Sequence, residues 1–180
     1  EEGAINLAQG FPDFDGPAAL CERVSWHMDH GHNQYAPLAG VPELRQQIAR
    51  KVAELYGCNV SPDTEITVTP GATEALFCAI TAVVQPGDEV IVFDPAYDTY
   101  DPAVTLNGAI CRHIPMTCPD FRIDWQRLRD TVNERTRLII LNTPHNPSGT
   151  CLTAGDLAEL RDIVRKRNVF LLSDEVYEHL

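Results

Sequence analysis

Positive charge, paired cysteines and long apolar runs are all scarce in this sequence. Lys and Arg total 14 against 26 Asp and Glu, and the formal net charge is −12. This excess of negative charge argues against nucleic-acid or anionic-membrane partners, so small-molecule chemistry is favoured. The six cysteines form no C-x-x-C pair, and several lie inside apolar patterns. We therefore expect reduced, buried thiols in a cytoplasmic protein. No apolar run approaches the ~18 residues of a membrane span.

Lysine is the scarcest charged residue. The only two are Lys51 and Lys166, both within charged stretches with a helical pattern. The acidic start Glu1-Glu2-Gly3 lacks the basic end of a signal peptide, and we interpret it as trimmed.

The periodicity of the sequence predicts an α/β fold. Hydrophobic content is 44%, enough for a substantial core. From Glu65 onward, short β-branched runs alternate with longer helical ones, which indicates parallel strands joined by crossover helices. The predicted strands are 66–69, 89–93, 110–114, 137–141 and 169–172. The predicted helices are 17–29, 42–56, 74–84, 97–106, 124–133 and 154–166, the last capped by Thr153.

Four polar clusters each begin where a predicted strand stops, which is where parallel sheets bind ligands. The first, Thr69 to Glu74, offers small residues, free N–H groups and a hydroxyl beside a helix start, as a phosphate requires. It matches neither G-x-G-x-x-G nor a P-loop. The alternative is an ordinary turn capped by Thr73.

The second and third clusters add an aromatic ring and two amides. Tyr97 follows the run Phe93-Asp94-Pro95-Ala96 and can lie flat against a heteroaromatic ligand, or simply pack a helix. The third cluster, Asn142 to Gly149, contains two prolines and is predicted to form a rigid loop whose asparagine amides donate to an oxygen. Its alternative is a turn-rich connection.

The fourth cluster places Asp174 at the exit of an apolar strand, within Ser173-Asp174-Glu175-Val176-Tyr177. A carboxylate there is costly to bury unless it meets a cation, and a protonated pyridine nitrogen is such a partner. The alternative is the N-cap of a following helix.

Taken in order, these clusters resemble the fold-type I pyridoxal-phosphate (PLP) aminotransferases of class I/II, and are most similar to the bacterial methionine and kynurenine-type enzymes. Residues 5–14 and 33–45 also resemble that branch. The resemblance covers the whole chain and implies the N-terminal half of such an enzyme. It implies a three-layer α/β/α, mostly parallel sheet, with an N-terminal segment at 1–34 on the small-domain side and an incomplete PLP-binding large domain at 35–180.

The resemblance also implies a role for each matching residue. The backbone of Ala72 and Thr73 would receive the cofactor phosphate, Tyr97 would stack on the ring, and Asp174 would pair with the ring nitrogen. The remaining implied site residues are Asn146 and Tyr177 at the phenolic oxygen, Asn142 behind them, Tyr35 at the phosphate of a neighbouring subunit, and Gly10 at the substrate carboxylate. The active site would then belong to a homodimer.

The family also needs a lysine that holds the cofactor and an arginine that binds the substrate carboxylate. Neither Lys51 nor Lys166 matches the lysine motif, so no catalytic residue is assigned, and we expect these 180 residues alone to lack activity. His145 is interpreted as ordinary variation. His27, His30 and His32 lie close together in the sequence, but no carboxylate-supported third ligand has the usual spacing of a metal site. No metal site is therefore assigned.

The predicted activity transfers an amino group between an amino acid, methionine or an aromatic one, and a 2-oxo acid. Two alternatives stay open: a PLP-dependent β-lyase on the same scaffold, and a non-catalytic effector domain of an aminotransferase-like regulator.

Overall fold

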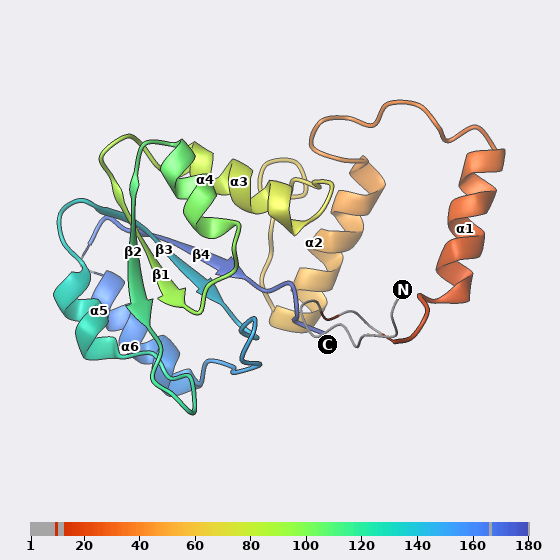
Figure 1. Ribbon diagram of the computed structural model, residues 1–180. Coiled ribbons are helices and arrows are strands. Elements are labelled where there is room, and N and C mark those ends of the chain that lie inside the picture. The colour runs from red at the N-terminus through yellow and green to blue at the C-terminus, as the bar shows by residue number, and fades with distance from the viewer. Residues whose placement is uncertain (1–9, 11–12, 166, 180) are drawn as a thin grey trace, which may run out of the picture. The chain divides into compact units, whose positions relative to one another are not determined.

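A computed structural model describes residue 10, residues 13–165 and residues 167–179 (Figure 1). The chain divides into two compact units, Glu1–Thr67 and Val68–Leu180, and each is described by itself. None of the helices in these described residues is long and apolar enough to cross a membrane. This division does not test the predicted domain limits, 1–34 and 35–180, which stay a prediction.

The first unit contains two helices, α1 (Ala18–Asp29) and α2 (Pro42–Tyr56). The predicted helix at 17–29 is present as α1, but all of its residues are exposed. In α2, the buried Arg45 guanidinium donates to the carbonyls of Gly40 and Pro62 and pairs with Asp63. Arg45 therefore ties together the loops that flank α2.

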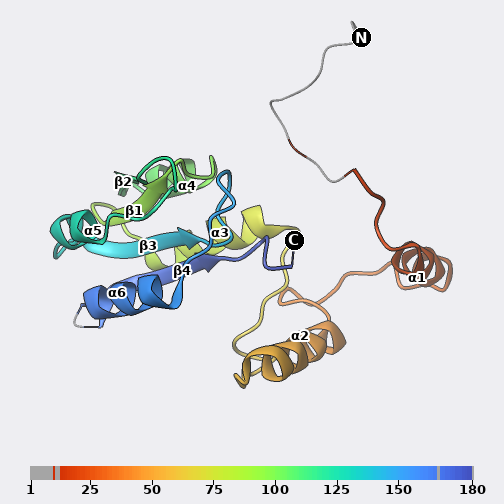
Figure 2. The ribbon, with the colours of Figure 1, turned by 90° about the horizontal axis from the view of Figure 1, so that it is seen from below.

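The second unit is built on a four-stranded sheet in which every pair is parallel. Its strands are β1 (Glu89–Asp94), β2 (Ile110–Pro115), β3 (Thr136–Asn142) and β4 (Phe170–Asp174). They lie in the order β2-β1-β3-β4, which Figure 2 shows in succession. The predicted parallel sheet is confirmed.

Helices cover both faces of this sheet, which confirms the predicted three-layer architecture. Figure 1 shows α3 (Ala72–Val83) and α4 (Tyr100–Leu106) on one face, and α5 (Trp125–Thr131) and α6 (Ala154–Val164) on the other. Side chains alternate along the central strands, so Val90 and Val92 pack with α3 and α4 while Ile91 and Phe93 pack with α5 and α6. Each face of the sheet therefore packs against its helices in its own apolar core.

A buried carboxylate anchors the amino-terminal end of the sheet. Glu89 is 1% exposed and accepts hydrogen bonds from Arg112, Asn133 and Arg135 at 2.6 to 3.0 Å. The bond from Arg112 contributes most to lowering the pKa of Glu89 to about 2, against the opposing effect of burial.

The predicted strand at Ile66–Thr69 is wrong, because this segment has no regular secondary structure and pairs with none of the described strands. β-branched residues favour extended backbone, yet a strand forms only where a partner completes its hydrogen bonds. Two helix starts differ from the prediction by more than one residue: α3 begins at Ala72 rather than residue 74, and α4 begins at Tyr100 rather than Tyr97. Lys166, at the end of the last predicted helix, lies outside the described residues.

The cysteines also depart from the prediction of buried thiols. Cys111 is half-buried, and the other five are exposed. An apolar neighbourhood in sequence does not ensure burial, since Cys78 lies on the open side of α3 although its neighbours Leu76 and Ile80 are in the core.

Candidate active site

The carboxyl ends of β1 and β3 form a topological switch point. From β1 the chain passes through α4 to β2 at one edge, and it returns through α5 to β3 on the other side of β1. The segments that follow β1 and β3 therefore leave toward opposite faces of the sheet. Such a divergence opens a crevice for a ligand, and the predicted polar clusters lie around it.

The amino end of α3 offers backbone donors to this crevice. Its N-cap is Gly71 at φ +90°, a conformation that favours glycine, and no side chain caps the helix. The first amides of a helix have no partner within the helix, and the helix dipole makes this end attractive to an anion. Thr73 lies inside the helix and is not its cap.

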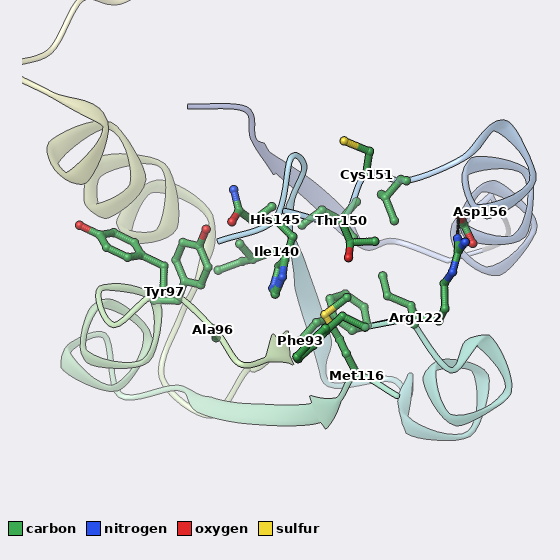
Figure 3. Close-up of a pocket in the computed structure, with 16 residues that line it drawn as sticks. Phe93, Ala96, Tyr97, Met116, Arg122, Ile140, His145, Thr150, Cys151 and Asp156 are labelled. Carbon is green, nitrogen blue, oxygen red and sulfur yellow. Dashed lines mark ion pairs between the residues drawn. The ribbon is translucent and has the colours of Figure 1, made fainter. Parts of the chain in front are cut away.

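Tyr97 lies beside this helix end. Its hydroxyl is 3.4 Å from the Thr73 Oγ1, and its ring meets the Tyr100 ring edge to face with centroids 5.7 Å apart. Figure 3 shows Tyr97 extending from the segment after β1. Because α4 begins only at Tyr100, Tyr97 belongs to the connecting segment and not to a helix face.

Asp174 ends β4 with a buried carboxyl group that accepts two hydrogen bonds. The Tyr100 hydroxyl donates to Oδ2 at 2.6 Å, and the Val176 amide donates to Oδ1 at 3.2 Å. Burial, and then the neighbouring carboxylate, raise the pKa of Tyr100 far above its usual value, so its hydroxyl stays protonated as a donor. Residues 176–179 form a turn, so Asp174 is not the N-cap of a helix within the described chain.

Asn142 joins the ends of β3 and β4. Its side-chain Nδ2 donates to the backbone carbonyl of Asp174 at 2.9 Å, and its Oδ1 accepts from the backbone N–H of Asn146 at 2.6 Å. The loop after β3 is therefore fixed relative to β4.

Most of the predicted site residues line one cavity of about 190 Å³. Its lining consists of Ala72, Thr73, Leu76, Tyr97, Asn142, Asn146, Asp174, Val176 and Tyr177. Gly10 and Tyr35 belong to the first unit, and both are exposed there.

The sequence did not predict the structural roles of two residues at this site. One is Tyr100, whose spacing of three from Tyr97 was the only available signal. The other is His145, which is 7% exposed. Its ring forms hydrogen bonds with Ser148 Oγ, at 2.7 Å, and with the backbone carbonyl of Pro95. His145 thus joins the loop after β3 to the segment that carries Tyr97.

His145 lies in an apolar region beside the site, where Figure 3 shows it between Tyr97 and the side chains around Phe93 and Met116. This burial lowers the pKa of the imidazole, against the opposing effect of the bond to Pro95. The ring is therefore a neutral brace between two loops of the site.

Comparison with known proteins agrees with this architecture. The family model "Aminotransferase class I and II" matches residues 2–180. Methionine aminotransferase of Escherichia coli is 55% identical over 98% of this chain and 46% of its own length. The probable N-succinyldiaminopimelate aminotransferase of Mycobacterium tuberculosis is 43% identical over 99% of the chain and 45% of its own length. The aspartate aminotransferase of Pyrococcus abyssi is 37% identical over 97% of this chain and 45% of its own length.

Solved structures give the same answer. The E. coli structure with methionine aminotransferase function superimposes with a TM-score of 0.95 over 98% of this chain and 47% of its own. The N-succinyldiaminopimelate aminotransferase structure of M. tuberculosis also has a TM-score of 0.95, at 42% identity, over 99% of this chain and 47% of its own. The chain thus spans about half the length of these relatives. It belongs to the class I and II aminotransferases, a family of PLP-dependent enzymes.

Proposed function

We propose that this chain supplies the cofactor-binding part of an aminotransferase that moves an amino group between an amino acid and a 2-oxo acid. One observation carries the proposal: a single cavity has uncapped helix amides at one part of its wall, an aromatic ring at another, and the carboxylate of Asp174.

The donor set in this cavity fits PLP. The amides of Ala72 and Thr73 suit a phosphate, because helix amino ends bind anions. Tyr97 offers a face for the pyridine ring. A carboxylate has about four lone-pair positions, and Asp174 uses two of them, so it can also accept a hydrogen bond from a ring nitrogen.

Bound PLP supplies an electron-withdrawing ring that stabilises negative charge at the substrate α-carbon. The chain's part is to hold that ring in its charged and correctly oriented form. The anionic Asp174 favours a proton on the ring nitrogen, since an opposite charge nearby stabilises the protonated form. Asn146 and Tyr177 would donate to the phenolic oxygen, while Asn142 keeps the Asn146 loop against β4.

The resemblance supports further roles in the complete protein. We propose a homodimer in which Tyr35 binds the phosphate of the neighbouring subunit, with Gly10 beside the substrate carboxylate. The relatives are about twice as long as this chain, and we expect the cofactor-holding lysine and the substrate-binding arginine in the region that it does not span. The cysteine usage supports our proposal of a cytoplasmic location.

Methionine is our first choice of amino-acid substrate, because the E. coli relative named for it is 55% identical. Aromatic amino acids and kynurenine are the next candidates. Relatives named for aspartate and N-succinyldiaminopimelate, at 37% and 43% identity, make a substrate panel necessary.

Steady-state transamination by the complete protein tests the proposal. We expect methionine and a 2-oxo acid to exchange the amino group, and Asp174→Asn to lower kcat about 100-fold through lost charge stabilisation. Asp162→Asn, which changes an exposed carboxylate of α6, is the matched control and should retain full activity. Equal activity of the two variants would contradict the proposal, and release of pyruvate and ammonia from a β-substituted amino acid would identify a lyase instead.

A further inference from the structure

A second cluster of chemically active side chains lies on the α4 side of the sheet. Cys111 and His113 alternate along β2 and so project from the same face of that strand, while Asp101 projects from α4. One ligand atom from each of these three residues lies within 4.8 Å of the other two. His113 Nε2 and Asp101 Oδ2 are 3.1 Å apart.

A fourth residue orients the imidazole of His113. The Asp94 Oδ1, at the end of β1, lies 3.0 Å from Nδ1 of this ring. A carboxylate that accepts from one ring nitrogen directs the lone pair of the other toward a metal, and metal-binding histidines generally have such a partner. The ring nitrogen available to a metal is therefore Nε2, which lies beside Asp101.

The spacing suits a small tetrahedral ion. Zinc bonds of about 2.0 to 2.3 Å to nitrogen, oxygen and sulfur place neighbouring ligand atoms about 3.3 to 3.8 Å apart. The three ligand atoms already lie within 4.8 Å of one another. Their side chains are partly exposed, so small rotations can bring the atoms about 1 Å closer, to the spacing around zinc.

We propose that Asp101, Cys111 and His113 bind a zinc-like divalent cation, with Asp94 supporting His113 and water in the fourth position. The mixed nitrogen, sulfur and oxygen set favours Zn²⁺ or Co²⁺ over Mg²⁺ and Ca²⁺, which prefer oxygen ligands. Without the ion, a protonated His113 can bridge the two carboxylates, and the metal replaces that bridging proton. Binding also releases the thiol proton of Cys111, so charge balances as the ion enters.

Electrostatics around the thiol favour its protonated form, so a bound ion must displace that proton. Burial, with Asp101 and Asp94 nearby, raises the pKa of Cys111 to about 12. A bound cation reverses the effect of these carboxylates, because it stabilises the thiolate directly. The occupied site would join the end of β1, the start of α4 and β2, and so brace the segment that carries Tyr97.

Cobalt(II) titration of the complete, chelator-treated protein tests this site. We expect one Co²⁺ per chain, with intense visible bands of tetrahedral cobalt and a thiolate-to-cobalt charge-transfer band, both displaced by Zn²⁺ and unaffected by Mg²⁺. Cys111→Ser should abolish the charge-transfer band, and His113→Asn should weaken Co²⁺ binding at least tenfold. Cys118→Ser removes an exposed thiol of the same unit and serves as the matched control.

Circular dichroism establishes that each variant is folded. Absence of the charge-transfer band in the unaltered protein would overturn the proposal. So would a band of equal strength in Cys111→Ser, which would locate the bound ion at other thiols. Neither result depends on amino transfer, so the metal site and the proposed function fail or stand separately.

Discussion

Removal of the Tyr100 hydroxyl by Tyr100→Phe should measurably destabilise the carboxyl end of β4. The hydroxyl is 2.6 Å from Asp174 Oδ2, and the two side chains are 3% and 8% exposed. A hydrogen bond to a charged group contributes about 1.5 to 3 kcal/mol, and the Phe ring leaves no cavity that would add to this loss. We therefore expect a loss of about 2 kcal/mol in the free energy of opening.

Hydrogen exchange of the β4 amides, read by mass spectrometry on the complete protein without added cofactor, measures this free energy. Tyr97→Phe is the matched control, because the Tyr97 hydroxyl makes only a long, exposed contact of 3.4 Å with Thr73 Oγ1. It should change the opening free energy by less than about 0.5 kcal/mol.

A double-mutant cycle with Asp174→Ala isolates the bond itself. The coupling between the two substitutions should equal most of the cost of Tyr100→Phe, since they remove the same contact. A coupling near zero, or equal costs for Tyr100→Phe and Tyr97→Phe, would refute the inference that this bond holds Asp174 in place.

Three further predictions concern stability. Glu89 has a pKa of about 2 instead of 4.5, so its contribution is present above pH 4.5 and is lost as the pH falls toward 2. Glu89→Gln should cost about 2 to 3 kcal/mol near pH 7 and show less acid dependence in urea titrations, since 2.5 pKa units correspond to at most about 3.4 kcal/mol. His145 has a lowered pKa, so the protein should lose stability as the pH falls below about 6.5. Thermal unfolding of His145→Phe should lack that part of the pH dependence. Thr153→Ala removes the capping box of α6 and should cost about 1 kcal/mol by urea unfolding.

The sequence predicted the sheet well because its strands are short apolar runs between clear helical patterns. The cap at Thr153 was also readable, since a capping residue acts on its own neighbours. Ile66–Thr69 failed because strand formation depends on a partner elsewhere in the chain, which a local pattern does not reveal.

Site residues divide in the same way. Residues at strand ends, such as Asp174, were identifiable because parallel strands bring those ends to one edge. Its partner Tyr100 was not, because their contact spans 74 residues and depends on how α4 packs against the sheet. The cation predicted beside Asp174 stays a prediction, and the structure adds two neutral donors, the Tyr100 hydroxyl and the Val176 amide. The cluster of Asp101, Cys111 and His113 was equally hidden, since it forms only when β2 lies beside α4.

A crystal structure of the complete protein with PLP tests the account most directly. We predict the phosphate at the amides of Ala72 and Thr73, and the ring nitrogen within hydrogen-bond distance of the Asp174 carboxylate. A cofactor bound elsewhere, or a ring nitrogen that points away from Asp174, would contradict it.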